Sequence, residues 1–280
     1  MKNIFIVAIV LLLPLIGTSQ IQTNNTEAIE EVKFRCIYTH FYQRDSTNKD
    51  DIRKEDMLLL IGKQCSRFIS CNKLKCDSLI HDFEKRGMPP EVVLADISIF
   101  PRTNFNYQVF KNYPEGKLTF FDRVFKDKYK YDEEVNCLNW QIHTDTVSIA
   151  GMKCQKAITS YAGRDYIAWF TNEIPVNDGP YKFHGLPGLI VKVGDTKNHY
   201  VFELKSVSKA KSGELVFYPI HETITTTCEG LLKARQAANC NIIQRLEQMG
   251  GKITDPEQRK ILSDKAKRKA KQRNNPMELM

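Results

Sequence analysis

The residues that could carry chemistry in this 280-residue chain fall into three groups. The first group offers metal ligands in the spacing C-x5-C-x4-C-x4-H, formed by Cys65, Cys71, Cys76 and His81. Structural zinc sites use closer pairs of ligands, such as C-x2-C. We therefore predict neither a metal nor any other cofactor, and interpret these cysteines as disulfide partners or buried thiols.

The second group is a run of three adjacent carboxylates, Asp132, Glu133 and Glu134. Paired carboxylates carry out glycoside hydrolysis. Adjacent acids alternate across a strand, however, and we favour a solvated turn as their explanation. The chain has no Gly-x-Ser-x-Gly nucleophile motif, and its glycine-rich stretch precedes a predicted strand instead of a helix. No catalytic residue is predicted, and an enzyme is disfavoured.

The third group begins with Arg164 and Asp165, which follow Gly163 in a predicted tight turn. A guanidinium can bind a carboxylate or backbone carbonyls through two hydrogen bonds. We expect Arg164 to lie near a turn at 178–181 and to lock the two loops together. The candidate binding residues, for which a structural role is favoured over ligand contact, are Arg164, Asp165, His184, Gly185, Leu186, Pro187 and Gly188.

The stretch 178–194 organises the rest of the chain. Leu186-Pro-Gly-Leu189 has the composition of a type II turn, in which proline presets φ at the second position and glycine supplies a positive φ at the third. The β-branched residues Ile190, Val191 and Val193 then predict a strand. Backbone geometry alone therefore explains these glycines and prolines, and we expect this turn and strand at the centre of a sheet.

A family resemblance rests on the hexapeptide Gly-Leu-Pro-Gly-Leu-Ile at 185–190 and on the motifs around it. These motifs are Lys153-Cys-Gln-Lys-Ala157, Gly163-Arg164, Ala168-Trp-Phe-Thr171, Ile174-Pro175 and Gly179-Pro180. In order and spacing they resemble the GLPGLI family of exported proteins from Gram-negative bacteria, and the ending Asn275-Pro-Met-Glu-Leu279 is similar to the family's C-terminus. The resemblance implies export and leaves the function open, because the family has no established biochemical activity.

Residues 1–19 have the composition of a secretory signal peptide. Lys2 precedes an apolar stretch, and Gly17 and Ser19 are the small residues expected before a cleavage site. We therefore expect a protein of the periplasm, associated with the outer membrane, or secreted. All eight cysteines follow the signal peptide, and an even number in an oxidising compartment favours disulfides. Local spacing groups Cys65 with Cys71 and Cys76, and Cys137 with Cys154.

Alternating apolar residues predict a mainly β protein whose antiparallel sheet forms a sandwich, bowl or open barrel. Residues 20–31 are expected to fray and 44–56 to form a charged loop, while 138–143 and 146–149 are expected as separate strands. One short helix is predicted near 77–87, with Asp77 as its N-cap and Gly87 as its stop. The predicted domains are the signal peptide 1–19, a β domain over 20–221 and a helical, basic segment over 222–280.

Within the C-terminal segment, the composition predicts helices over 228–249, ended by Gly250-Gly251, and over about 256–272, capped by Asp255. Residues 252–273 carry nine of the lysines and arginines against three acids, within a net charge of +8 for the chain. A solvated helix face is the favoured explanation, and contact with an anionic membrane surface is the alternative. Nucleic acid is not an expected partner, because the basic run contains no aromatic residue.

These observations favour an exported binding or interaction protein of the bacterial envelope, with an envelope protein or a glycan as partner. The first alternative is a carrier of an apolar ligand such as a lipid, since curved antiparallel sheets can enclose cavities. In that case part of the pocket would be formed by Phe100, Phe105, Phe110, Phe120, Phe121 and Phe125, although filling a core is the favoured role of these rings. A hydrolase acting on glycan or peptide is the second alternative.

Overall fold

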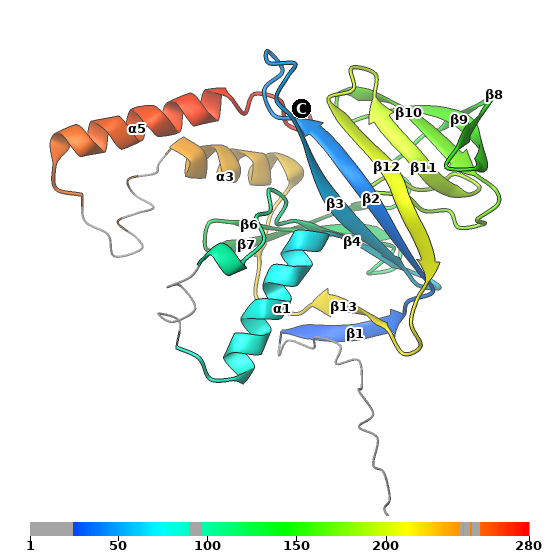
Figure 1. Ribbon diagram of the computed structural model, residues 1–280, viewed down its shortest axis with the longest axis horizontal. Helices are drawn as coiled ribbons and strands as arrows, with labels where there is room; N and C mark the ends of the chain where they lie inside the picture. Colours follow the sequence, from blue (N-terminus) through cyan, green and yellow to red (C-terminus); the bar gives the residue numbers. More distant parts are fainter. Residues whose placement is uncertain (1–24, 90–96, 241–242, 244–246, 248–252, 280) are drawn as a thin grey trace, which may run out of the picture.

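The computed structural model describes residues 25–89, 97–240, 243, 247 and 253–279, so the predicted signal peptide lies outside the described residues (Figure 1). Within this part of the chain, no helix combines the length and apolar character that a membrane span requires. The expectation of a mainly β protein with one helix in the N-terminal half and helices near the C-terminus is confirmed.

Short strands account for most of the described secondary structure. Their bounds are β1 Thr26–Glu31, β2 Phe34–Gln43, β3 Ile52–Ile61, β4 Ser66–Ser70, β5 Gln108–Lys111, β6 Lys117–Val124, β7 Asp127–Glu134, β8 Gln141–Ile149, β9 Met152–Tyr161, β10 Arg164–Thr171, β11 Leu189–Asp195, β12 Tyr200–Lys209, β13 Leu215–Pro219 and β14 Ile224–Thr225. The helices are α1 Cys71–Lys85, α3 Cys228–Cys240 and α5 Pro256–Lys271, with a single 3-10 turn at Ile97–Ile99.

Twelve of these strands form one open, curved sheet in the order β14-β7-β6-β5-β4-β3-β2-β12-β11-β10-β9-β8. All pairs are antiparallel except β14 with β7. Strand β11, which follows the hexapeptide turn, is an interior strand, two places from the central strand β2 and three from the β8 edge. Strands β1 and β13 pair separately and lie apart from β8 and β9 (Figure 1).

Strand bounds are predicted well where apolar and polar residues alternate. They are predicted less well where a strand contains charged residues or is set by pairing with a distant strand. The expectation of a charged loop over 44–56 is wrong from Ile52 onward, because β3 continues its antiparallel pairing with β2 into the charged residues. Residues 26–31 do not fray, since β13 pairs with them. Residues 141–149 form a single strand, because a register shift between Ile142 and Thr146 absorbs the polar interruption.

Helix α1 begins six residues before the predicted N-cap. Ser70 ends β4 in an extended conformation, and its hydroxyl accepts hydrogen bonds from the amides of Asn72 and Lys73, both at 3.1 Å. Asp77 instead lies inside the helix and pairs with Lys73 one turn earlier. The predicted stop is confirmed, because the helix ends at Lys85 and Gly87 follows with φ at +63°.

Two hydrophobic clusters fill the structure. The larger one combines residues of β2, β3, β6, β10 and β11 with Phe183 and Leu186 of the loop 172–188, which we name the signature loop. The smaller one, around Phe110, Phe121 and Tyr218, lies between the sheet and the β1–β13 pair. The signature loop is therefore part of the main core and is not a surface connection.

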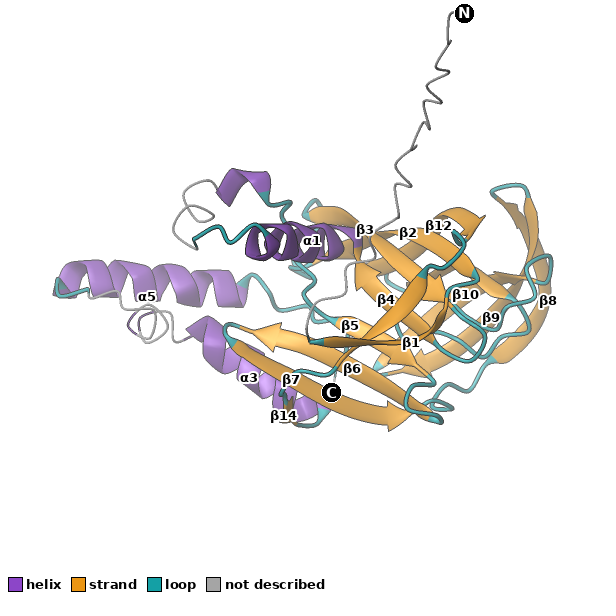
Figure 2. Cartoon of the chain, turned by 90° about the horizontal axis from the view of Figure 1, so that it is seen from below, coloured by secondary structure: helices purple, strands orange, loops and turns teal. Residues whose placement is uncertain are grey.

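The C-terminal helices extend from the sheet and lie side by side (Figures 1 and 2). α5 starts as predicted, with the Asp255 carboxylate accepting from the amide of Glu257 and with Pro256 in the first turn. The predicted stop at Gly250-Gly251 lies outside the described residues. After α5 the chain returns to the sheet, where Asn275 and Glu278 are buried.

Candidate functional site

The signature turn has a different geometry from the predicted one. Gly188 does not have a positive φ; the residue of the turn that does is Gly185, at +89°. Gly188 is required for another reason, because a Cβ atom there would lie 2.1 Å from the carbonyl oxygen of Thr171. The type II turn expected at Leu186–Leu189 is therefore wrong, and close packing against the end of β10 explains the second glycine.

Lys182 lies three residues before the hexapeptide 185–190, and its side chain is 0% exposed. Its Nζ lies 2.7 Å from Glu278 Oε1, 2.9 Å from Glu133 Oε2 and 2.9 Å from the hydroxyl of Tyr161. Four aromatic rings surround the ammonium at 5.0–5.7 Å, namely Phe120, Tyr131, Tyr161 and Tyr181. Because β7 and β9 supply two of these partners, Lys182 joins two distant parts of the curved sheet.

Glu278 is the buried counter-ion of Lys182 and comes from the C-terminal segment. Its carboxylate also accepts hydrogen bonds from the Tyr181 hydroxyl at 2.5 Å and from the Cys228 thiol at 2.8 Å. Burial acts to raise the pKa of Glu278, but Lys182 and the hydrogen bonds from Cys228 and Tyr181 outweigh it, so the pKa lies below its ordinary value. Burial and then Glu278 raise the pKa of Cys228 to about 11, which keeps the thiol protonated.

The ligand atoms of Glu133, Cys228 and Glu278 lie within 4.8 Å of one another, as they would around a metal ion. This cluster does not fit a metal, because the Lys182 ammonium already contacts both carboxylates and the Cys228 thiol donates to Glu278. The cluster is instead a buried ion-pair network.

Arg164 binds the C-terminal segment with its whole guanidinium fork. It donates to the backbone carbonyl of Met277 at 3.0 Å and of Pro276 at 2.5 Å, and to the side-chain oxygen of Asn275 at 2.6 Å. It also forms a buried ion pair with Asp195 at 3.0 Å. The predicted mode of binding is therefore observed, but the expected partner is wrong, because Arg164 locks the chain end instead of the turn at 178–181.

The other predicted residues are dispersed. Asp165 is exposed and accepts from the Ser160 hydroxyl at 2.5 Å. Leu186 is buried in the core, whereas Pro187 is exposed. The ring of His184 lies between the carbonyls of Lys182, at 2.7 Å, and Val135, and the residue lines a second cavity of about 470 Å³.

The three adjacent carboxylates are engaged separately, as an alternating strand requires. Asp132 pairs with Lys130 on its own strand, Glu133 with Lys182 and Glu134 with Lys117. The solvated turn favoured for them is wrong, because all three lie within β7. They do not converge on a common site as a glycosidase pair would.

The seven cysteines whose side chains are described are free thiols. Cys36, Cys65 and Cys154 are buried in or beside sheet strands, while Cys71 and Cys76 lie on α1. No pair among these seven forms the disulfides that the composition predicts.

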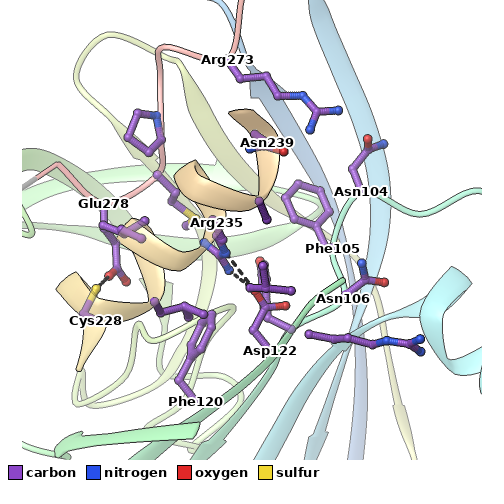
Figure 3. A pocket seen from close by; sticks show the side chains of 18 of the residues that line it. Asn104, Phe105, Asn106, Phe120, Asp122, Cys228, Arg235, Asn239, Arg273 and Glu278 are labelled. Atoms are coloured by element: carbon purple, nitrogen blue, oxygen red, sulfur yellow. Dashed lines mark hydrogen bonds and ion pairs between the residues drawn. The ribbon is translucent and has the colours of Figure 1, made fainter. Parts of the chain in front are cut away.

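A cleft of about 380 Å³ with an aromatic lining lies between the sheet, α3 and the C-terminal segment (Figure 3). Its rings come from β2, β6, β7, β12, the β6–β7 turn and the segments before β5 and β11: Tyr42, Phe105, Tyr107, Phe120, Phe125, Tyr131, Tyr181 and Tyr200. Leu231, Leu232 and Ala238 of α3 supply an aliphatic wall. We name this cavity the aromatic cleft; its size and lining are typical of small-molecule sites.

Polar groups reach the aromatic cleft at a few positions. Arg235 of α3 donates two hydrogen bonds to Asp122 of β6, at 2.6 and 2.8 Å, which holds the helix over the rings (Figure 3). Tyr107 lines the cleft, and its buried hydroxyl has no hydrogen-bond partner among the described residues. Burial raises the pKa of Tyr107 well above its ordinary value, so this hydroxyl is a neutral donor and acceptor.

The phenylalanines, favoured as core residues and expected in a pocket only if the protein carries an apolar ligand, divide between the two roles. Phe105, Phe120 and Phe125 line the aromatic cleft, whereas Phe110 and Phe121 belong to the smaller core cluster and Phe100 packs on Phe83 of α1. The residues of α3 and the chain end were missed as cleft residues. The one signal in the sequence was the apolar stripe of α3, whose inward direction becomes apparent only when the helix is docked.

Comparison with known proteins gives a family match over part of the chain. The model of a family described as "Protein of unknown function (Porph_ging)" matches residues 161–192, which include Arg164, Lys182 and the whole hexapeptide 185–190. No curated protein matches the chain.

Two solved structures are similar over part of their length. They are titled "Structure of PNGF-II in P21 space group" and "Structure of PNGF-II in C2 space group", with TM-scores of 0.49 and 0.47 and 15% identity in each case. Each match covers 74% of this chain, which spans about a third of the PNGF-II chain: 34% and 33%.

Proposed function

We propose that the protein is an exported binding protein of the bacterial envelope, of the GLPGLI type, and that its ligand is a small molecule bound in the aromatic cleft. The observation that carries this proposal is the concentration of aromatic rings around one accessible cavity, with an unpaired buried hydroxyl, that of Tyr107, among them. A buried polar group without a partner is costly, and a ligand that hydrogen-bonds it removes that cost.

The signature and the C-terminal segment support this role by forming a rigid frame. Met277 and Glu278 line the cleft and are held from behind by Arg164 and Lys182. A preformed cleft loses little conformational entropy on binding, so a ligand binds it more tightly than it would bind a flexible site with the same contacts. In this proposal Arg164 and Lys182 position the cleft and do not contact the ligand.

The second cavity is a weaker candidate for the same role. It is lined mainly by polar residues and strand ends, and the Lys111 ammonium within it is already paired with Asp178. The carrier of an apolar ligand remains the second function, favoured by Phe105, Phe120 and Phe125 in the aromatic cleft.

The test is to block the aromatic cleft without changing the surface chemistry of the helix. Leu232→Trp places a large ring in the cleft, and Lys233→Trp places the same ring on the neighbouring position, whose side chain is 73% exposed. The mature protein would be screened against envelope extracts and lipid mixtures by native mass spectrometry and thermal shift. We expect saturable binding that Lys233→Trp retains and Leu232→Trp loses; equal binding by both variants would place the ligand elsewhere.

A further inference from the structure

The mouth of the aromatic cleft carries an excess of guanidinium groups. The chain end runs beside the β2–β3 connection: the Asn275 amide donates to the Arg44 carbonyl at 3.2 Å, and the Asn275 side chain donates to the Gln43 carbonyl at 2.6 Å. This pairing brings Arg273 next to Arg44, and both residues line the cleft. Figure 3 shows the Arg273 side chain above Phe105 and Asn104.

One nearby carboxylate, Asp51, is shared by two guanidiniums. It accepts hydrogen bonds from Arg53 at 3.0 Å and from Arg44 at 3.4 Å, so its single negative charge is divided between them. Glu55, the next carboxylate, is buried and accepts from Ser70, Thr103 and the amide of Asn104. No carboxylate of the described residues pairs with Arg273. Burial and the positive charges of Arg44 and Arg53 lower the pKa of Arg273, as expected for a cation placed among like charges.

Arg44 has a second property of an unfilled anion site. Its Nε is buried and has no hydrogen-bond partner among the described residues, and the residue lines the cleft. An N–H group of a guanidinium without an acceptor is costly, and a tetrahedral oxyanion between two guanidiniums supplies several acceptors at once.

We infer that the ligand of the aromatic cleft is a phosphate ester with an apolar or aromatic body. Its phosphate group binds Arg44 and Arg273, while its body lies on the rings of Phe105 and Tyr107. This inference rests on the proposed function, because it names the ligand class of the same cleft. The shared chemistry is the phosphoryl group, which either a phospholipid headgroup or a small phosphorylated metabolite can supply.

Titration calorimetry with the full mature chain and four probes separates the contribution of the phosphate group from that of the apolar body. The probes are phenyl phosphate, inorganic phosphate, the neutral analogue benzyl alcohol, and dihexanoyl phosphatidic acid. Phenyl phosphate is expected to bind more tightly than either inorganic phosphate or benzyl alcohol, because only it engages both the rings and the arginines. Tighter binding of the phosphatidic acid would identify the lipid source, and tighter binding of phenyl phosphate the small-molecule source.

Arg273→Gln and Arg44→Gln are each expected to weaken phosphate-ester binding by roughly tenfold or more, since each removes charge-assisted hydrogen bonds. Arg273→Lys should restore part of the affinity, and Arg259→Gln, on the exposed side of α5, should leave it unchanged. Thermal unfolding of each variant verifies that the fold is intact.

Two results would overturn the inference. If benzyl alcohol binds as tightly as phenyl phosphate and Leu232→Trp abolishes both, the cleft binds ligands without an anion site, so the proposed function stands alone. If the glutamine variants bind phenyl phosphate like Arg259→Gln, the phosphate does not contact these arginines. Absence of cleft binding for every probe and every envelope component would remove both proposals.

Discussion

Replacing Lys182 by methionine is the sharpest test of the argument that a buried ion pair holds the C-terminal segment in place. Methionine keeps the length and much of the volume of the side chain and removes the charge. Glu278, only 7% exposed, then loses its counter-ion, while Glu133, 25% exposed, can still be hydrated. Most of the lost stability is therefore expected to come from the unpaired, desolvated charge of Glu278.

Removing one partner of a buried ion pair costs about 3–5 kcal/mol, because the remaining charge stays desolvated. Tyr181 and Cys228 still donate to Glu278, which limits the loss, but the four rings around the ammonium also lose their cation. We expect Lys182→Met to lower the free energy of unfolding by about 3–5 kcal/mol, a large share of the 5–15 kcal/mol typical of a folded domain.

Urea unfolding followed by tryptophan fluorescence measures this change, with Lys192→Met as the matched control. Lys192 pairs with Glu203 on the same sheet, but both side chains are about 40% exposed, so its loss should cost no more than about 1 kcal/mol. The double variant Lys182→Met/Glu278→Gln should cost at least about 1 kcal/mol less than the sum of the single variants, since it removes the unpaired charge.

Two outcomes would refute this reasoning. A loss for Lys182→Met as small as that for Lys192→Met would mean that the pair contributes nothing beyond a surface contact. Additive effects in the double variant would mean that Lys182 and Glu278 do not interact energetically. Hydrogen exchange at the Leu279 amide, which donates to the Ala162 carbonyl at 2.8 Å, reports in parallel whether the segment has been released.

Three further predictions follow from the same contacts. Arg164→Lys should release the chain end and speed exchange of the Leu279 amide by about tenfold or more, because an ammonium cannot reproduce the fork that binds three successive residues; unchanged exchange would contradict the clamp. Gly188→Ala should lower the free energy of unfolding by at least about 1–3 kcal/mol in urea titrations, since the added carbon meets the Thr171 carbonyl at 2.1 Å; a neutral effect would show that the strand end can yield. The pKa of Glu278 is lowered in the folded protein, so its stabilisation is complete above about pH 4.5 and is lost as the pH falls below that value; Glu278→Gln should therefore flatten the acid limb of stability measured against pH, and an unchanged limb would exclude this carboxylate.

The sequence by itself determined the features that depend on neighbouring residues. The β class, most hairpins, the stop of α1 at Gly87 and the start of α5 at Asp255 could be predicted, because turn, cap and alternation signals act within a few positions. Even the ability of Arg164 to bind carbonyls followed from its chemistry. The boundaries that were wrong, such as the start of α1, depended on which residue the preceding strand brought to the cap.

Only the tertiary structure decided which residues form the candidate site. Tyr181 and Glu278 lie 97 positions apart and share a hydrogen bond. The charged residue Lys182 is fully buried, because strands β7 and β9 and the C-terminal segment supply its partners. Gly188 is a glycine because Thr171 lies against it. The aromatic cleft likewise exists only once α3 and the chain end return to the sheet, since loop closure over such distances leaves no local signal.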